Sequence, residues 1–177
     1  MPVALFLLAD GFEELEFIAP YDILHRGGIS VSTASISGKN EVLGAHGLKI
    51  LTDDSTDFDM LVLPGGAVGT ENLLKSESVK SLLIKSYEAG KKIAAICAAP
   101  KVLANAGILA SHKATSYPGV RAYVEPFCKK YLDVPVVVSG NIITSRSAGT
   151  AAEFGFCLLS LMADFETADS VKRKMFF

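Results

Sequence analysis

Short apolar runs alternate with helix-like segments along almost the whole chain, and this rhythm limits the folds open to it. The runs predicted as strands are residues 3–8, 30–36, 60–63, 92–96, 114–116, 136–139 and 142–144. The segments predicted as helices are residues 15–25, 78–89, 100–106 and 148–162. The run from Ala4 to Leu8 does not alternate polar with apolar residues, which is typical of strands covered on both faces. We therefore predict an α/β fold with a mainly parallel sheet and helices on both faces.

One stretch interrupts the rhythm. Residues 38–52 hold turn-forming sequences at Gly38-Lys39-Asn40 and from Gly44 to Gly47, with short apolar runs beside them, so we expect a small hairpin there. The chain has 177 residues, half of them apolar, and shows no internal repeat or linker. We expect a single domain that covers residues 1–177.

Composition argues against several kinds of partner. The formal charge is −2 with scattered lysines and glutamates, which gives no reason to expect nucleic acid or an anionic membrane as the main partner. The three cysteines are widely spaced and form no CxxC pair, so we expect a reducing compartment without disulfides or zinc. The apolar amino terminus has no basic leader and stops at Asp10. We expect a soluble cytoplasmic protein.

Cys97 is the first candidate for chemistry. It stands where the apolar run 92–96 stops and the helical segment 100–106 is about to begin. A side chain at such a sharp strand-to-helix turn is presented to a cleft, and the amino end of a helix favours a thiolate. Cys97 is therefore a candidate nucleophile or redox-sensing thiol. A buried packing cysteine is the alternative.

Other chemical groups follow the ends of the predicted strands. Because the carboxyl ends of parallel strands meet at one edge of a sheet, these groups are expected to share a pocket with Cys97. They are Glu13, Glu14, Gly65, Gly66, Ala98, Tyr117 and Arg146.

Each of these groups has a chemical use and a structural alternative. Glu13 or Glu14 would hydrogen-bond the sulfur or move a proton, or would only favour the start of its helix. The N–H groups of Gly65, Gly66 and Ala98 would form an oxyanion hole.

The remaining polar candidates are an aromatic and a basic side chain. Tyr117 would supply a hydroxyl, and Arg146 would anchor an anion or form a structural salt bridge. His25 ends the first helix, where a cation suits the helix dipole. Neither His46, in the glycine-flanked hairpin segment, nor His112 has a sequence position that obviously reaches Cys97.

Four motifs in order give the chain a resemblance to a known family. They are Asp10-Gly11-Phe12-Glu13-Glu14-Leu15-Glu16, Leu63-Pro64-Gly65-Gly66-Ala67-Val68-Gly69-Thr70-Glu71-Asn72-Leu73, Ala94-Ala95-Ile96-Cys97-Ala98-Ala99-Pro100, and Thr144-Ser145-Arg146 with Gly149-Thr150. The pattern resembles the ThiJ/PfpI superfamily, in the branch of bacterial YajL and the human parkinsonism-associated protein deglycase. The resemblance implies a flavodoxin-like three-layer sandwich and a homodimer with the first helix near the interface.

The resemblance also implies roles for single residues. Cys97 would be the reactive nucleophile-elbow cysteine, held in a strained backbone conformation, and Glu14 the acid that hydrogen-bonds its sulfur. Gly65, Gly66 and Ala98 would shape the anion-binding side of the pocket. The implied activity is that of a glyoxalase or deglycase without cofactor or metal, acting on small reactive dicarbonyls or early glycation adducts.

Departures from the family pattern leave other functions open. Protease-like members usually carry a histidine where this chain has Ala98, so a cysteine peptidase or amidase ranks low. Close relatives of the human protein have a histidine in place of Tyr117 and an arginine in place of His46. A redox-responsive stress protein or chaperone, in which Cys97 oxidises to a sulfinate stabilised by Glu14, is the main alternative to an enzyme.

Overall fold

A six-stranded sheet forms the centre of the computed structural model, which describes residues 1–53 and 56–177. Its strands, in spatial order, are β2 (Ser30–Ser35), β1 (Val3–Leu8), β5 (Met60–Leu63), β6 (Lys92–Ile96), β10 (Ile142–Ser145) and β9 (Val136–Ser139). All neighbouring pairs are parallel except β10 with β9. The predicted mainly parallel sheet is confirmed.

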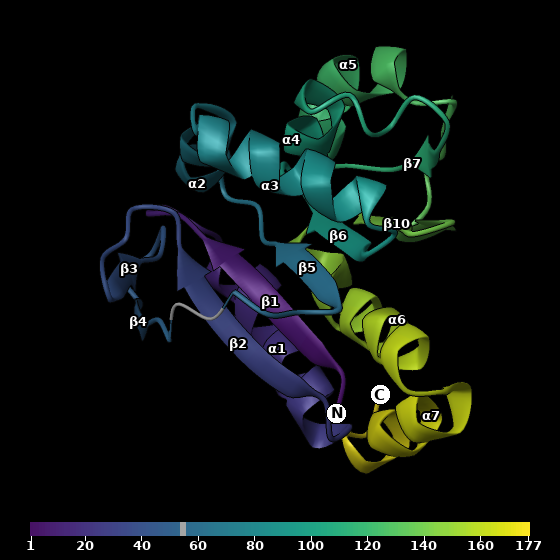
Figure 1. Cartoon of the computed structure of the whole chain (residues 1–177). Helices are drawn as coiled ribbons and strands as arrows, with labels where there is room; N and C mark the ends of the chain where they lie inside the picture. The colour runs from purple at the N-terminus through teal and green to yellow at the C-terminus, as the bar shows by residue number, and fades with distance from the viewer. Residues whose placement is uncertain (54–55) are drawn as a thin grey trace.

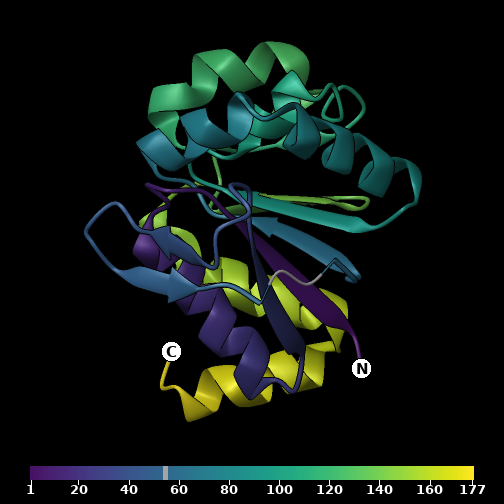
Figure 2. The same cartoon turned by 60° about the vertical axis from the view of Figure 1, so that its left-hand side comes forward.

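Helices cover both faces of this sheet, as the two views in Figures 1 and 2 show. On one face lie α1 (Glu14–Arg26), α6 (Ala151–Met162) and α7 (Phe165–Lys174). On the other face lie α2 (Ala67–Leu74), α3 (Glu77–Glu88), α4 (Pro100–Asn105) and α5 (Arg121–Val124). Short 3₁₀ turns occur at Pro118–Val120, Glu125–Phe127 and Ala148–Thr150.

The central strand β1 explains why both layers are needed. Phe6 and Leu8 pack into the core on the α1 side, whereas Leu5 and Leu7 pack into the core on the α3 side. Phe17 of α1 meets Phe6 edge to face at a centroid distance of 5.3 Å. Because successive side chains of a strand point to opposite faces, an all-apolar strand requires a cover on each side.

The predicted hairpin is confirmed. Strands β3 (Glu41–Leu43) and β4 (Lys49–Leu51) pair antiparallel, with the turn between them. The hairpin reaches back to the amino end of α1, where the N–H of Gly11 donates to the carbonyl of Leu43 at 2.7 Å.

The predicted strand 114–116 is wrong as a member of the main sheet. Strand β7 (Lys113–Ala114) pairs with β8 (Lys130–Tyr131) in a separate two-stranded sheet. The backbone leaves the ladder at Thr115, whose N–H donates to the side-chain oxygen of Thr144 at 2.9 Å. Helices α2, α5 and α7 were not predicted, and the long helix expected over 148–162 begins with a 3₁₀ turn before α6.

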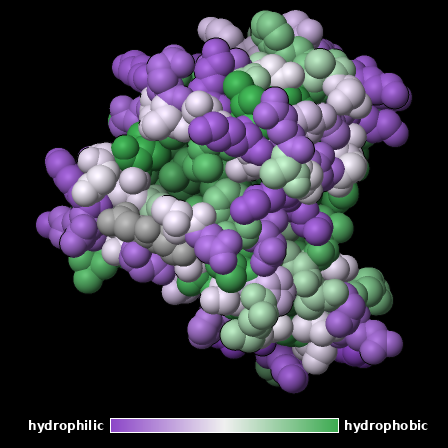
Figure 3. Space-filling model, in the orientation of Figure 1, coloured by the Kyte–Doolittle hydropathy of each residue, from purple (hydrophilic) through white to green (hydrophobic). Residues whose placement is uncertain are grey.

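Within the two stretches that the structure describes, no helix has the length and apolar character needed to cross a membrane. Hydrophilic side chains cover much of the face shown in Figure 3, and hydrophobic ones gather beneath α2 and α3.

Candidate active site

Cys97 occupies a strained turn directly after β6. Its φ angle is 64°, in the left-handed region that side chains other than glycine rarely adopt. Two backbone hydrogen bonds hold it there: its N–H donates to the carbonyl of Ser145 at 2.9 Å, and its carbonyl accepts from the N–H of Tyr117 at 2.7 Å. Such a conformation costs on the order of 1–2 kcal/mol and persists only when the surroundings impose it. The predicted sharp turn is confirmed.

The acid beside Cys97 is Glu16, not Glu14. The carboxyl group of Glu16 is hydrogen-bonded to the thiol of Cys97, and its Oε2 accepts the N–H of Gly65 at 2.8 Å. Only 1% of Glu16 is exposed. The prediction for Glu14 is wrong because residues two apart on a helix of 3.6 residues per turn point to nearly opposite sides.

Burial and proximity shift the titration of both groups. Burial raises the pKa of Glu16 to about 7, although hydrogen bonds with Cys97 and Gly65 act in the other direction. Burial also raises the pKa of the Cys97 thiol, and so does negatively charged Glu16, whereas the backbone N–H groups of Ala98 and Gly66 lower it. Burial and Glu16 therefore outweigh the helix dipole that was expected to favour a thiolate at Cys97. The dipole is also weak here, because α4 begins only at Pro100 and is six residues long.

These shifts indicate that Cys97 and Glu16 share one proton. When Glu16 is ionised, the thiol of Cys97 is the donor, and when Glu16 is protonated its carboxylic acid donates to sulfur and stabilises a thiolate. Because the pKa of the thiol is raised, the proton rests on sulfur when Glu16 is ionised, and a thiolate forms only when that proton passes to Glu16.

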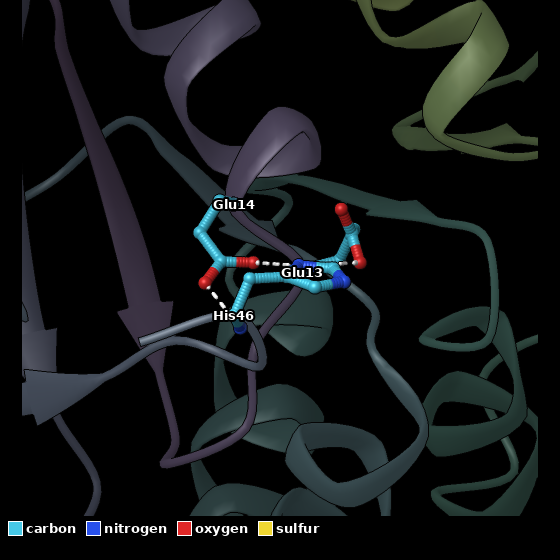
Figure 4. Close-up of side chains that lie close together, drawn as sticks. All are labelled: Glu13, Glu14 and His46. Carbon is cyan, nitrogen blue, oxygen red and sulfur yellow. Dashed lines mark hydrogen bonds and ion pairs between the residues drawn. The ribbon is translucent and has the colours of Figure 1, made fainter. Parts of the chain in front are cut away.

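Glu14 instead lies against His46 of the hairpin turn (Figure 4). Its Oε1 accepts the backbone N–H of His46 at 2.6 Å, and its Oε2 lies 2.7 Å from the ring Nδ1 of His46. Burial raises the pKa of Glu14, but the hydrogen bonds from His46 outweigh it and hold the pKa below its usual value. The same contact raises the pKa of His46.

Glu13, Glu14 and His46 are also the described residues that could hold a metal ion. Their donor atoms lie within 4.8 Å of one another, and the Oε2 of Glu13 is 3.8 Å from the Nδ1 of His46. The imidazole is 72% exposed, and its hydrogen bond and ion pairs account for the arrangement without a metal.

A cavity of about 510 Å³ opens beside Cys97, and four of the seven groups predicted to share it, Glu13, Gly66, Ala98 and Tyr117, belong to its lining. Its lining consists of Glu13, Glu16, Gly66, Ala67, Thr70, Glu71, Cys97, Ala98, Lys101, Tyr117, Gly119, Val120, Ser147, Ala148 and Gly149. Tyr117 therefore enters the pocket, as does Ala98, whereas neither Glu14 nor His46 belongs to the lining.

Two predicted site residues have other roles. Gly65 is not in the lining; its N–H is taken by Glu16, so it positions the acid rather than an oxyanion. Arg146 is also outside the lining and pairs with Asp133, with 2.9 Å between Nη1 and Oδ1, so the salt-bridge alternative holds. Gly66, with φ at 93°, does face the cavity, and a Cβ there would lie 2.7 Å from the backbone N of Glu13.

Sequence reasoning missed the polar groups that line the cavity from α2 and α4. They are Thr70, Glu71 and Lys101, and Glu71 and Lys101 form an ion pair at 2.6 Å. The one signal was position: Lys101 comes four residues after Cys97, at the start of the predicted helix. The missed Glu16 had a clearer signal, because it stands in the same acidic run as Glu14.

Comparison with known proteins identifies the family. The model of the DJ-1/PfpI family matches residues 3–161. The chain belongs to the DJ-1/PfpI family. It is 39% identical to Protein dj-1beta of Drosophila melanogaster over 176 residues, covering 96% of this chain and 94% of that protein. It is 38% identical to Deglycase PH1704 of Pyrococcus horikoshii over 148 residues, covering 80% and 88%.

Solved structures of the DJ-1/PfpI family share the fold. The crystal structure of Drosophila melanogaster DJ-1beta superposes with a TM-score of 0.92 at 38% identity, covering 99% of this chain and 97% of that one. The oxidized DJ-1 of Toxoplasma gondii gives a TM-score of 0.94 at 28% identity, covering 100% and 99%. The observed sandwich agrees with that of these family members.

Proposed function

We propose that this DJ-1/PfpI member is a cysteine-dependent glyoxalase or deglycase that acts on small reactive dicarbonyls or early glycation adducts without a cofactor. The observation that carries the proposal is the hydrogen bond between Cys97 and the buried Glu16 at the wall of a cavity. Relatives named deglycase, at 38% and 37% identity, support it. We expect the activity in the cytoplasm, which cell fractionation tests.

The first step is addition of sulfur to a carbonyl. The Cys97 thiolate forms a C–S bond with the aldehyde carbon of methylglyoxal, the carbonyl π pair moves to oxygen, and that oxygen takes the proton of Glu16. The product is a hemithioacetal. Gly66 and Ala98 line the cavity, and their backbone N–H groups, which reach the Cys97 sulfur, would stabilise the developing oxyanion.

The second step is an internal redox reaction that needs no external oxidant. Glu16 removes the proton from the carbon that bears sulfur and returns a proton to the neighbouring carbonyl carbon, through an enediol. The former aldehyde carbon becomes a thioester and the ketone becomes an alcohol. Water then cleaves the thioester to lactate and regenerates the thiol. Since the pKa of Glu16 is about 7, the group both gives and takes protons near neutral pH.

Lactate formation from methylglyoxal, without glutathione and after removal of metals, tests this function. Cys97→Ser is expected to reduce turnover by at least about 10³-fold, because the hydroxyl is a far weaker nucleophile than a thiolate. Cys128→Ser is the matched control and is expected to retain turnover, since Cys128 lies outside the cavity lining. No turnover above buffer by the fully reduced protein would refute the enzyme.

A redox-responsive role is the second candidate, favoured by the similarity to the oxidized Toxoplasma gondii DJ-1. Cys97 would take one oxygen atom from each of two peroxide molecules, each leaving water, and end as a sulfinate hydrogen-bonded to Glu16. Mass spectrometry of the Cys97 peptide after mild peroxide measures this. Retained protection of unfolding client proteins by Cys97→Ser would separate a chaperone activity from both cysteine-dependent functions.

A homodimer through α1 belongs to the same proposal. Leu15 and Ile18 of α1 are exposed apolar side chains, as are Leu43 and Leu48 beside the hairpin turn. Light scattering after size exclusion is expected to give twice the mass of the chain, and Ile18→Glu is expected to reduce it to the monomer. A monomeric unmodified protein would contradict the dimer without affecting the catalytic proposal.

A further inference from the structure

The catalytic cavity is larger than a three-carbon dicarbonyl requires. At about 510 Å³ it lies within the range of roughly 300–1,000 Å³ found for sites that hold drug-sized ligands. Methylglyoxal would fill only a small part of this space. A substrate that uses the whole cavity therefore has a tail beyond the carbonyl that reacts with Cys97.

The cavity wall from α2 and α4 shows what kind of tail would fit. Lys101 places its Nζ 2.6 Å from the Oε1 of Glu71 and 4.7 Å from the ring centroid of Tyr123. Both residues of the pair also line a second cavity of about 430 Å³. We call Thr70, Glu71 and Lys101 the α2–α4 wall.

Thr70 adds an unsatisfied group to this wall. Thr70 is 2% exposed, and its hydroxyl oxygen has no hydrogen-bond partner in the part of the chain that the structure describes. An unpaired buried hydroxyl costs roughly 1–3 kcal/mol. In its present rotamer this oxygen is closed off from the cavity, and a ligand hydroxyl at this wall would engage it through the second χ1 rotamer that a helical threonine can adopt.

Charge decides between an anionic and a neutral tail. Among the described residues, the cavity is lined by the carboxylates of Glu13 and Glu71, by the buried carboxyl group of Glu16 and by the ammonium of Lys101, which is already paired. An anionic tail would have to displace Glu71 from Lys101 and would be repelled by both carboxylates. A neutral hydroxyl can donate to Glu71 and accept from Lys101 without breaking the pair.

An apolar tail is also disfavoured, because it would remove water from the ion pair without replacing its hydrogen bonds. The small residues Ala67, Ala98 and Gly119 leave room for the carbon skeleton of the tail on the rest of the lining.

We infer that the α2–α4 wall is a specificity subsite for hydroxyl groups, and that the substrates of this protein are 2-oxoaldehydes with a hydroxylated, sugar-derived tail. The inference rests on the proposed glyoxalase or deglycase chemistry at Cys97. The wall binds the tail while the reactive carbonyl lies against the sulfur.

Three longer 2-oxoaldehydes separate the possibilities: 3-deoxyglucosone with a hydroxylated tail, 2-oxohexanal with an apolar tail, and 4,5-dioxopentanoate with an anionic tail. The expected kcat/KM is highest for 3-deoxyglucosone, by about 10-fold over each of the others, as expected for hydrogen bonds to charged groups. A preference for 2-oxohexanal or 4,5-dioxopentanoate would overturn the inference.

Variants of the wall connect the preference to these residues. Lys101→Met and Glu71→Gln are each expected to lower the ratio of kcat/KM for 3-deoxyglucosone to that for methylglyoxal by about 10-fold, and Thr70→Val by about 3-fold. Lys49→Met and Glu41→Gln break a similar ion pair in the hairpin, with 2.9 Å between Nζ and Oε1, and are expected to leave the ratio unchanged. An unmoved ratio in all three wall variants would overturn the assignment.

A binding measurement keeps this test independent of turnover. Calorimetry with Cys97→Ala protein, which cannot form the hemithioacetal, is expected to show 3-deoxyglucosone binding more tightly than 2-oxohexanal, and Lys101→Met is expected to abolish the difference. If methylglyoxal is not turned over but this preference is present, the proposed reaction fails and the subsite stands. If methylglyoxal is turned over and the preference is absent, the subsite fails alone.

Discussion

Two carboxylates at the start of α1 show how differently one short sequence can be used. Glu14 and Glu16 are separated by one residue, yet Glu14 binds the exposed His46 while Glu16 is buried against Cys97. The pKa of Glu14 is lowered and that of Glu16 is raised to about 7. The residue type is the same, so the environment alone determines that Glu16 is suited to proton transfer and Glu14 to an ion pair.

The sharpest test of this comparison is the activity of matched variants. Glu16→Gln is expected to lower kcat for methylglyoxal by about 10²-fold or more, because it removes the proton-transfer group. Glu14→Gln is expected to stay within about 2-fold, because Glu14 lies outside the cavity lining. The pH profile of kcat/KM in the unmodified protein should have a limb near pH 7 that is lost in Glu16→Gln. Equal losses in both variants would contradict the division of roles.

Stability as a function of pH gives the next largest effect. Between pH 4.5 and about 7 the folded protein holds the Glu16 proton that the unfolded chain releases, so the free energy of unfolding falls as pH rises. A rise in pKa from 4.5 to about 7 corresponds to roughly 3 kcal/mol. Relative to the unmodified protein, Glu16→Gln should therefore gain about this much between pH 4 and pH 9 in urea unfolding. A difference that does not change with pH would show that Glu16 titrates normally.

The sequence predicts the sheet better than the site, because strands are encoded by neighbouring residues whereas the site depends on contacts between distant segments. Strand β1 is predicted with its exact bounds, since apolar runs covered on both faces need only local sequence. Helix α2 is missed because it follows a glycine pair and is only eight residues long, and the segment at Thr115 reads as a strand although a side chain of β10 takes its N–H.

The site depends on how α1 is rotated about its own axis and on contacts between distant segments. The sequence predicts Cys97 at a sharp turn, because a strand end and a helix start flank it, while the strained backbone observed there is implied only by the family resemblance. It does not fix where α1 begins, and an offset of one or two residues exchanges the buried and exposed sides of a helix. The ion pair of Arg146 with Asp133 and that of Lys101 with Glu71 likewise depend on tertiary contacts that no local pattern encodes.

Two glycines beside the two carboxylates provide a third test. A Cβ at Gly65 would lie 2.6 Å from the Oε2 of Glu16 and 2.9 Å from the carbonyl of Ile96, in a buried site that cannot yield. The three atoms nearest to a Cβ at Gly44 all belong to the side chain of Glu14, whose flexible end can shift.

Gly65→Ala is therefore expected to lose about 2 kcal/mol of stability, and Gly44→Ala less than about 1 kcal/mol. Chemical unfolding of both variants measures this, and a larger loss in Gly44→Ala would contradict the rigidity assigned to the Glu16 site.

The smallest expected effect concerns the exposed pair. The raised pKa of His46 means that its pairing with Glu14 stabilises the fold at acidic pH and is lost as the pH rises through that value, whereas the lowered pKa of Glu14 means that the pairing is also lost in strong acid. The difference in Tm between the unmodified protein and His46→Ala should therefore be largest near about pH 6 and smaller at about pH 9. Because the imidazole is 72% exposed, the difference should be slight and should shrink further in high salt. A difference that grows toward pH 9 would show that His46 acts through packing rather than through charge.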